Sequence, residues 1–250
     1  MKKKLVAKMS GIKKMEPTKR NRFFSEDEIE KLCAFGRERY GQMPIEERFE
    51  YELRNAFITV QYELALRSGE TANIAWEDFQ NAEDNGDGII TIKIRHGKWR
   101  KSDESDAIPV VYSRLKPTLE LWKGISEEYC KKYGINPLEI KDSGKKYHPI
   151  FFNSKSQQLA SNICTNIVKK QCKFAGIELN RGESSPHLRL ARITHLLNKE
   201  MPIDLLRSFA RHREKEMRRR FCIDPLVHLI RWFKADGLLH HSRKQVHRVE

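Results

Sequence analysis

The 250-residue sequence lacks the features of secreted, zinc-binding and membrane-spanning proteins. Its five cysteines are odd in number and widely spaced, and no Cys-x-x-Cys pair occurs. Neither a disulfide framework nor a zinc ribbon is therefore expected, and we predict reduced thiols. No apolar run reaches the roughly 18 residues of a membrane-spanning helix, and none near Met1 is long enough for a signal peptide. These absences predict an intracellular, cytoplasmic protein.

Acidic residues are also scarce relative to basic ones. The chain has 34 Asp and Glu against 48 Lys and Arg, a formal net charge of +14. An excess of this size indicates a polyanionic partner, nucleic acid before a membrane surface. The sequence has no acidic cluster typical of metal-dependent nucleases and no Gly-x-x-x-x-Gly-Lys-[Ser/Thr] loop. The residues therefore imply no metal, no other cofactor and no ATP.

The apolar periodicity predicts a mainly α fold with one small antiparallel β-sheet, an α+β domain. Residues 1–22 are rich in Lys and Arg and lack this periodicity, so we interpret them as a basic arm or linker. One compact domain follows over 23–225, and 226–250 hold a C-terminal helix and a polar tail. Ser25 and Glu28 form a capping box for the first helix. Helices are expected at about 26–35, 46–66, 69–75, 114–133, 159–175, 187–198, 202–211, 214–221 and 225–236, with an irregular connection at 135–149.

The two strands of the sheet are predicted at 89–94 and 107–112, joined by a polar, basic turn. Before them, the stretch from Asp84 to Gly88 superficially looks like a calcium loop. With Gly88 at the sixth position of such a loop, the twelfth is Ile94, where a bidentate Glu is required. We therefore predict a hairpin turn there.

Basic and imidazole residues occur in four places where a solvated surface explains them poorly. Arg67 follows an apolar helix at a Ser-Gly break, and Glu70, three residues on, can hold it rigid. Lys98 lies on the turn between the strands, where a lysine can reach a DNA groove or act as a mobile proton donor. An ordinary surface ion pair and a solubilising turn are the alternatives at these two places.

The other two places lie in the helical C-terminal half. His187 and Arg189 open one predicted helix, and His212 precedes a very basic one. For His195, flanked by apolar residues, we predict a satisfied core histidine. Together, two arginines, a lysine and two imidazoles can stabilise a phosphoryl transition state without a metal. Arginine forks clamp phosphate oxygens, and Lys or His protonates a leaving oxygen.

In order and spacing, these segments resemble the tyrosine recombinases, which are site-specific recombinases of the phage integrase type. The likeness extends over roughly residues 20–225. Ala210-Arg211-His212 stands where the family usually has Leu-Gly-His. The other matching segments are 66–70 and 76–78 for the first box, 97–98 and 108–110 for the β-hairpin lysine, 150–152 to 174–177 for the stretch before the second box, and 186–189 with 194–197 for the second box itself.

The resemblance implies a role for each candidate residue. Arg67 and Arg189 would clamp the scissile phosphate, and His212 would add a hydrogen bond to it. Lys98 would be the general acid for the leaving 5′-oxygen, with Lys101 as the fallback. His187 would lie near the nucleophile as an acceptor or base. Further basic residues would contact DNA: Arg100, Lys101, Arg211 and Arg218.

The sequence departs from the family pattern at two positions. Pro186 stands where the family has a histidine, and His187 lies one residue later. The nucleophile position, a tyrosine in the family, is Phe221, and no tyrosine occurs after Tyr147. Phenylalanine keeps the ring but lacks the oxygen that attacks phosphorus in forming the 3′-phosphotyrosine intermediate. Either a Tyr→Phe change was engineered, which we favour, or a natural relative has lost cleavage.

The resemblance implies the catalytic domain of a metal-independent DNA recombinase or integrase of a mobile genetic element. Its partners would be a double-stranded attachment site and further copies of the chain, as a tetramer on synapsed DNA. The helix in 226–250 would dock either on a neighbouring protomer or on its own domain. The arm is too short to form the family's N-terminal DNA clamp. A non-catalytic DNA-binding regulator and a type IB topoisomerase-like enzyme are the alternative functions.

Overall fold

A computed structural model describes residues 23–34, 37–95, 106–142, 144–180, 183–211 and 228–235. The fold is mainly helical with a small antiparallel sheet, as predicted, and a two-stranded sheet that was not predicted is also present. Among the described helices, none is long and apolar enough to cross a membrane. The elements are α2 (Glu26–Ala34), η1 (Arg37–Gln42), α3 (Ile45–Glu63), α4 (Ser68–Ala72), α5 (Trp76–Gln80), β1 (Glu83–Asp84), β2 (Ile89–Ile94), β3 (Asp106–Val111), α6 (Tyr112–Tyr133), β4 (Ile140–Asp142), β5 (Lys145–Tyr147), α7 (Ser161–Phe174), α8 (Pro186–Asn198) and α9 (Ile203–Phe209).

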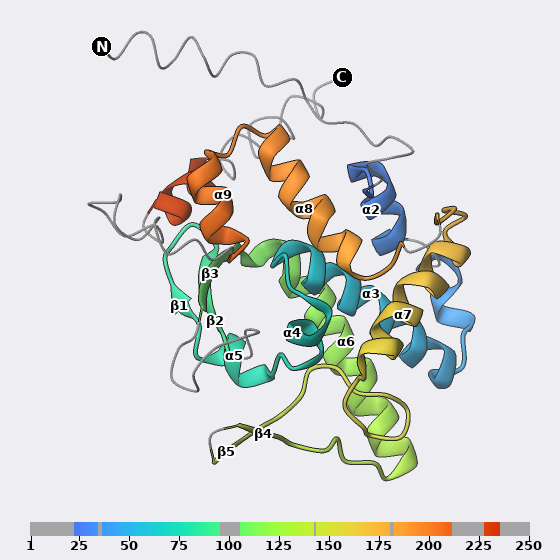
Figure 1. Cartoon of the computed structure of the whole chain (residues 1–250). Coiled ribbons are helices and arrows are strands. Elements are labelled where there is room, and N and C mark those ends of the chain that lie inside the picture. Colours follow the sequence, from blue (N-terminus) through green and yellow to red (C-terminus); the bar gives the residue numbers. More distant parts are fainter. Residues whose placement is uncertain are drawn as a thin grey trace, which may run out of the picture.

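Helix α3 is the centre of the core. Every residue from Tyr51 to Glu63 is buried, which is the pattern of a helix surrounded by other elements. It contacts α6 on one side and α8 on another, with α2 and α7 completing its cover (Figure 1). Helix α3 ends at Glu63, shortly before Arg67, which is the N-cap of α4. The packing of α3 therefore fixes the position of the segment that carries Arg67.

The β2–β3 pair forms the sheet predicted from the sequence. The strands are antiparallel, with Ile92 opposite Ile108, and β1 adds a short third strand. The stretch between β1 and β2 is a hairpin turn, as predicted: Gly86 N donates to Asp84 Oδ1 at 2.8 Å, and residues 86–88 all have positive φ. The basic turn that follows β2, residues 96–105, lies outside the described residues.

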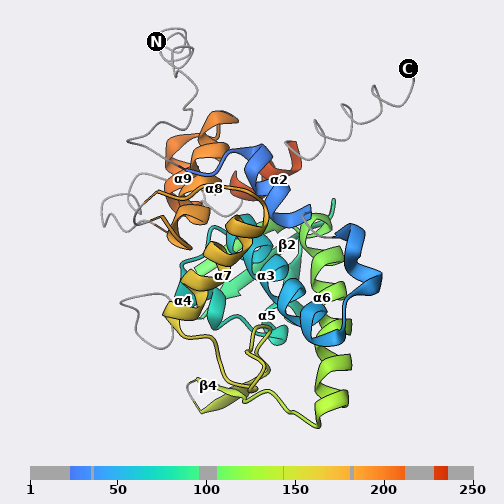
Figure 2. The same cartoon turned by 90° about the vertical axis from the view of Figure 1, so that its right-hand side faces the viewer.

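The sequence signals for the ends of helices are confirmed, whereas two short polar strands were missed. Glu28 N donates to Ser25 Oγ at 3.2 Å, and Ser25 N donates to a Glu28 carboxylate oxygen at 2.9 Å, which is the expected capping box. Gly134 ends α6 in the left-handed conformation, at φ +62°. The prediction of an irregular connection at 135–149 was wrong in part, because β4 and β5 form a hairpin there. This hairpin lies at the opposite end of the molecule from α8 and α9 (Figures 1 and 2).

The C-terminal helix predicted from the sequence is present over 228–235. Leu229 and Phe233 are buried, and the Phe233 ring packs against Phe209 of α9 with 5.6 Å between ring centroids. In the single chain, this segment therefore packs on its own domain. The basic arm at 1–22 and the predicted helix at 214–221 lie outside the described residues. The cysteines that the structure describes form no disulfide with one another: Cys33, Cys130, Cys164 and Cys172.

Candidate phosphate-binding site

The connection between α3 and α4 places Arg67 at the start of a short helix. Glu70 accepts hydrogen bonds from Arg67 N at 2.8 Å and from Arg67 Nη1 at 2.7 Å. The Glu70 side chain is 2% exposed and that of Arg67 is 41% exposed. The carboxylate therefore holds Arg67 from the interior and leaves part of its guanidinium open to solvent, as the spacing of the two residues predicts.

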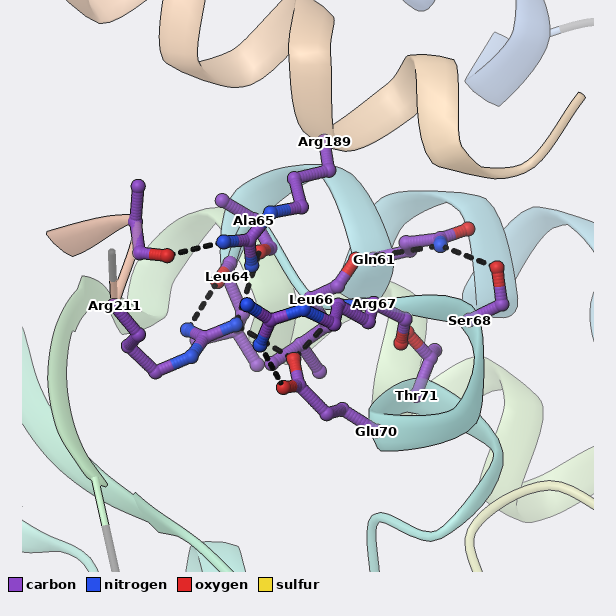
Figure 3. A network of polar contacts seen from close by, with 11 residues as sticks. Gln61, Leu64, Ala65, Leu66, Arg67, Ser68, Glu70, Thr71, Arg189 and Arg211 are labelled. Carbon is purple, nitrogen blue, oxygen red and sulfur yellow. Dashed lines mark hydrogen bonds and ion pairs between the residues drawn. The ribbon is translucent and has the colours of Figure 1, made fainter. Parts of the chain in front are cut away.

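Arg189, on the first turn of α8, reaches the same connection. Its Nη1 donates to Ala65 O at 2.6 Å, and its Nη2 donates to Ala210 O at the end of α9. Ala65 has a φ of +45°, a left-handed conformation that is rare for residues other than glycine. Carbonyl oxygens are neutral, so these two bonds orient the Arg189 guanidinium without cancelling its charge. The structure thus brings together Arg67 and Arg189, which lie far apart in the sequence (Figure 3).

Arg211, grouped with the DNA contacts in the sequence analysis, lies in the interior. Its Nη2 is 2.6 Å from Glu70 Oε2 and also donates to Ala65 O at 3.1 Å. Its side chain is only 3% exposed. The surface role expected for Arg211 is therefore not the arrangement of this structure, in which the residue is a buried partner of Glu70.

The charge state of Glu70 follows from these contacts. Burial alone would raise its pKa, but the attraction of Arg211 and the hydrogen bonds from Arg67 outweigh that effect. The pKa of Glu70 therefore lies below its ordinary value. An ionised carboxylate at this point can accept hydrogen bonds from both arginines at once.

His187 is half-buried at the start of α8, and its ring caps the preceding turn. Ser184 N donates to His187 Nδ1 at 3.1 Å. In the neutral ring, this bond assigns the proton to Nε2, which then acts as a donor. The family resemblance implied that His187 is an acceptor or base. In this tautomer Nδ1 is the nitrogen suited to that role, and it already accepts the Ser184 N–H.

A buried polar bridge between α3 and α8 was not anticipated from the sequence. Ser185 Oγ donates to Gln61 Oε1 at 2.7 Å, and Ser68 Oγ lies 2.7 Å from Ser185 Oγ. Ser68 directly follows Arg67, so the bridge ties the Arg67 segment to the start of α8. The one signal in the sequence is a glutamine within an otherwise apolar helix face.

Arg95 and Tyr147, which were not among the predicted site residues, help to fix the base of the basic turn. Arg95, just after β2, donates to both carboxylate oxygens of Asp78 at 2.7 and 2.9 Å. Its guanidinium carbon lies 3.6 Å from the centre of the Tyr147 ring. Asp78 is the last residue of the 76–78 segment (Trp-Glu-Asp) that matches the family's first box. That segment therefore anchors the end of β2, the strand that leads to Lys98.

Six of the residues predicted for the site lie outside the described part of the chain: Lys98, Arg100, Lys101, His212, Arg218 and Phe221. Within the described part, no three His, Cys, Asp or Glu side chains converge as metal ligands. What is described is a basic site in which Arg67 and Arg189 are oriented before any ligand binds. Such an arrangement can bind and polarise a phosphate.

Comparison with known proteins gives one family and one fold. The model of the phage integrase family matches residues 22–222. The XerH site-specific recombinase bound to difH substrate, in a pre-cleavage complex, is similar with a TM-score of 0.57 and 17% identity, over 86% of this chain and 58% of that one. The XerH post-cleavage complex with palindromic difH has a TM-score of 0.56 and 17% identity, over 93% and 56%.

A third solved structure, that of XerA recombinase, has a TM-score of 0.48 and 16% identity, over 84% of this chain and 64% of that one. The chain thus spans less than two thirds of the length of each of these recombinases. No curated protein matches the sequence. At such identities, the two XerH matches show the fold alone.

Proposed function

The chain belongs to the phage integrase family of tyrosine recombinases, and from that membership we propose that it is the catalytic domain of a site-specific DNA recombinase. The observation that supports the proposal is the meeting of Arg67 and Arg189 on the 65–70 segment (Figure 3). Glu70 orients one guanidinium and the Ala65 carbonyl orients the other. Groups that are oriented in advance need little reorganisation when charge develops in the transition state.

In the proposed reaction, the two guanidiniums bind the non-bridging oxygens of the scissile phosphate. A tyrosine hydroxyl attacks phosphorus and loses its proton to solvent, and the bond to the 5′-oxygen breaks. Lys98, or Lys101 in its place, gives a proton to that oxygen, leaving a 3′-phosphotyrosine and a 5′-hydroxyl. The 5′-hydroxyl of a second strand then attacks phosphorus and releases the tyrosine. His212 donates a hydrogen bond to the phosphate, and no metal is required.

Because residue 221 is a phenylalanine, the chain lacks the tyrosine hydroxyl that this reaction needs. We therefore propose that the chain binds and aligns DNA but does not cleave it. Its partners would be a double-stranded attachment site, contacted by Arg100, Lys101 and Arg218, and further copies in a tetramer on synapsed DNA. The location would be cytoplasmic, where such DNA is found.

The test compares the chain with its Phe221→Tyr variant. The DNA is the duplex that the chain binds most tightly in a random-sequence pool, nicked at successive positions to trap any cleaved strand. A denaturing gel is expected to show a covalent protein–DNA band for Phe221→Tyr and none for the chain itself. Adding Arg67→Ala to Phe221→Tyr should abolish the band, and normal cleavage by that double variant would contradict the assignment.

The second candidate function is a non-catalytic regulator that occupies recombination sites, and Phe221 is the observation that favours it. A regulator would bind the selected duplex tightly, yet Phe221→Tyr would give no adduct at any nick position. Relaxation of supercoiled DNA without sequence preference would instead indicate the topoisomerase-like alternative. The single gel series therefore separates a recombinase from a regulator.

A further inference from the structure

Arg211 combines an unfavourable backbone conformation with a buried charge. Its φ is +53°, in the left-handed region that residues with a β-carbon rarely adopt. Its side chain is 3% exposed, whereas arginines are seldom fully buried unless they are paired. Backbone strain persists only where the surroundings over-determine it, and it concentrates at functional sites. The neighbours of Arg211 must therefore hold it in place.

Three of the groups that contact the Arg211 guanidinium belong to the segment from the end of α3 into α4. Arg211 Nη2 contacts Glu70 Oε2 at 2.6 Å and Ala65 O at 3.1 Å, and Nη1 donates to Leu64 O at 3.5 Å. Three acceptors on one short segment fix both the position and the plane of the guanidinium (Figure 3). The turn that follows α9 is thus fastened to the segment that carries Arg67.

Each acceptor that Arg211 shares leads to one of the two phosphate-clamping arginines. Glu70 Oε2, which Arg211 contacts, also accepts from Arg67 N, while Oε1 accepts from Arg67 Nη1. Ala65 O, which Arg211 also contacts, accepts from Arg189 Nη1 at 2.6 Å. The Glu70 carboxylate is therefore shared by Arg67 and Arg211, and the Ala65 carbonyl by Arg189 and Arg211.

We propose that Arg211 is a positioning residue of the phosphate site, acting through the Glu70 carboxylate on Arg67 and through the Ala65 carbonyl on Arg189. The proposal rests on the proposed function for the identity of the bound phosphate. Arg211 supplies the buried positive charge that keeps Glu70 ionised and able to accept both bonds from Arg67. The charge of the half-exposed Arg67 then remains available to the substrate.

The first test measures the link between Arg211 and Glu70 without any activity. The ¹³C signal of the Glu70 carboxyl group is followed against pH by NMR in the full chain and is assigned by its loss in Glu70→Gln. The charged groups around Glu70 are Arg67 from α4 and Arg211 after α9, with Arg189 of α8 joined through Ala65. Because Arg211 attracts the ionised carboxylate, Arg211→Gln should make Glu70 titrate at higher pH. Arg211→Lys should give a smaller shift.

Two further variants serve as controls, one for unfolding and one for the change in net charge. Arg211→Gly removes the charge and relieves the left-handed strain, so it keeps the measurement possible where Arg211→Gln unfolds the chain. Arg207→Gln makes the same charge change at an exposed position of α9 and should leave the Glu70 titration where it was. An unmoved Glu70 titration in Arg211→Gln or Arg211→Gly would overturn the proposal.

The second test measures cleavage by Phe221→Tyr on the nicked, selected duplex. Arg211→Gln in that background should lower the cleavage rate at saturating DNA by about 10²-fold, the loss typical of slightly misplaced reacting groups. DNA affinity should not change. The fall in rate on the acid side should begin at higher pH, because Glu70 then protonates more readily, whereas a purely structural defect would lower the rate equally at every pH. Arg211→Lys should restore part of the rate, and Arg207→Gln should keep all of it.

The opposite pattern would mean that Arg211 turns outward to contact DNA directly. In that case, affinity and its salt dependence would fall while the rate at saturating DNA stayed the same, which would overturn the positioning role. The absence of any adduct from Phe221→Tyr alone would contradict the proposed function instead. The Glu70 titration would still decide whether Arg211 controls the carboxylate.

Discussion

Helix α8 carries two buried arginines, Arg189 and Arg192, which have different kinds of partner. Arg192 Nη2 lies 2.8 Å from Glu63 Oε2, and its guanidinium lies over the Tyr62 ring at 5.1 Å. Arg189 donates to the carbonyl oxygens of Ala65 and Ala210. Arg192 thus has a carboxylate partner, whereas two carbonyl oxygens orient Arg189.

This difference separates a structural from a functional use of the same side chain. A buried ion pair balances two charges and fastens α8 to α3, so breaking it strands a charge in the core. Carbonyl acceptors fix the direction of a guanidinium without neutralising it, so its charge remains effective toward a phosphate. We therefore expect Arg192, through its ion pair, to control stability and Arg189, through its oriented guanidinium, to control chemistry.

The largest expected effect is on stability, at the Arg192–Glu63 ion pair. Glu63→Ala leaves the Arg192 charge in the core without its carboxylate, which should lower the free energy of unfolding by about 3–5 kcal/mol. Urea denaturation of the full chain measures this loss. A Glu63→Leu, Arg192→Leu double variant should recover most of it, because no stranded charge remains. A loss under about 1 kcal/mol in Glu63→Ala would show that the pair behaves like a surface ion pair.

The next largest effect is on chemistry, at Arg189. Lysine keeps the charge but cannot reach two carbonyls and a phosphate with a planar fork. Arg189→Lys in the Phe221→Tyr background should therefore slow covalent adduct formation by about 10²-fold or more and cost less stability than Glu63→Ala. Arg192→Lys on the same helix is the matched control and should cleave at close to the unmodified rate. Equal losses of rate in the two variants would contradict the distinction between the two arginines.

The sequence was informative wherever a signal is local. Apolar periodicity predicted α3 and α8, and the three-residue spacing predicted the Arg67–Glu70 pair. The β4–β5 hairpin was missed because three-residue polar strands carry no alternation of apolar residues to detect. Local patterns thus give the helices and one edge of the site.

The remainder of the site depends on contacts between distant segments. Nothing local distinguishes Arg189 from Arg192, since both are basic residues in one amphipathic helix, and only the partners contributed by α3 and by the turn after α9 separate them. Arg211 was assigned to the surface for the same reason, because its buried carboxylate partner lies in another helix. A sequence therefore proposes charged residues, and the packing of the helices decides which of them face inward.

The smallest expected effect is the pH dependence of stability that His195, one turn after Arg192 in α8, produces. His195 is 3% exposed, and its Nδ1 lies 2.8 Å from the Tyr62 hydroxyl, which fits the core histidine predicted from the sequence. Burial lowers the pKa of His195, and the positive charges of Arg192 and Lys199 add to this, while Glu26 opposes it.

Because the folded pKa of His195 is lowered, the unfolded chain binds this proton more readily than the folded one. The stability that neutral His195 contributes is therefore complete above its ordinary pKa of about 6.5 and is lost as the pH falls below it. One linked proton changes the free energy of unfolding by at most about 1.4 kcal/mol per pH unit. Urea unfolding of the chain and of His195→Gln at pH 7.5, 6.5 and 5.5 should show the two stabilities converging toward acid pH, since every other histidine is present in both proteins. Parallel pH profiles would mean that Arg192 and its neighbours stabilise α8 through the ion pair and packing alone, with no contribution from the protonation state of His195.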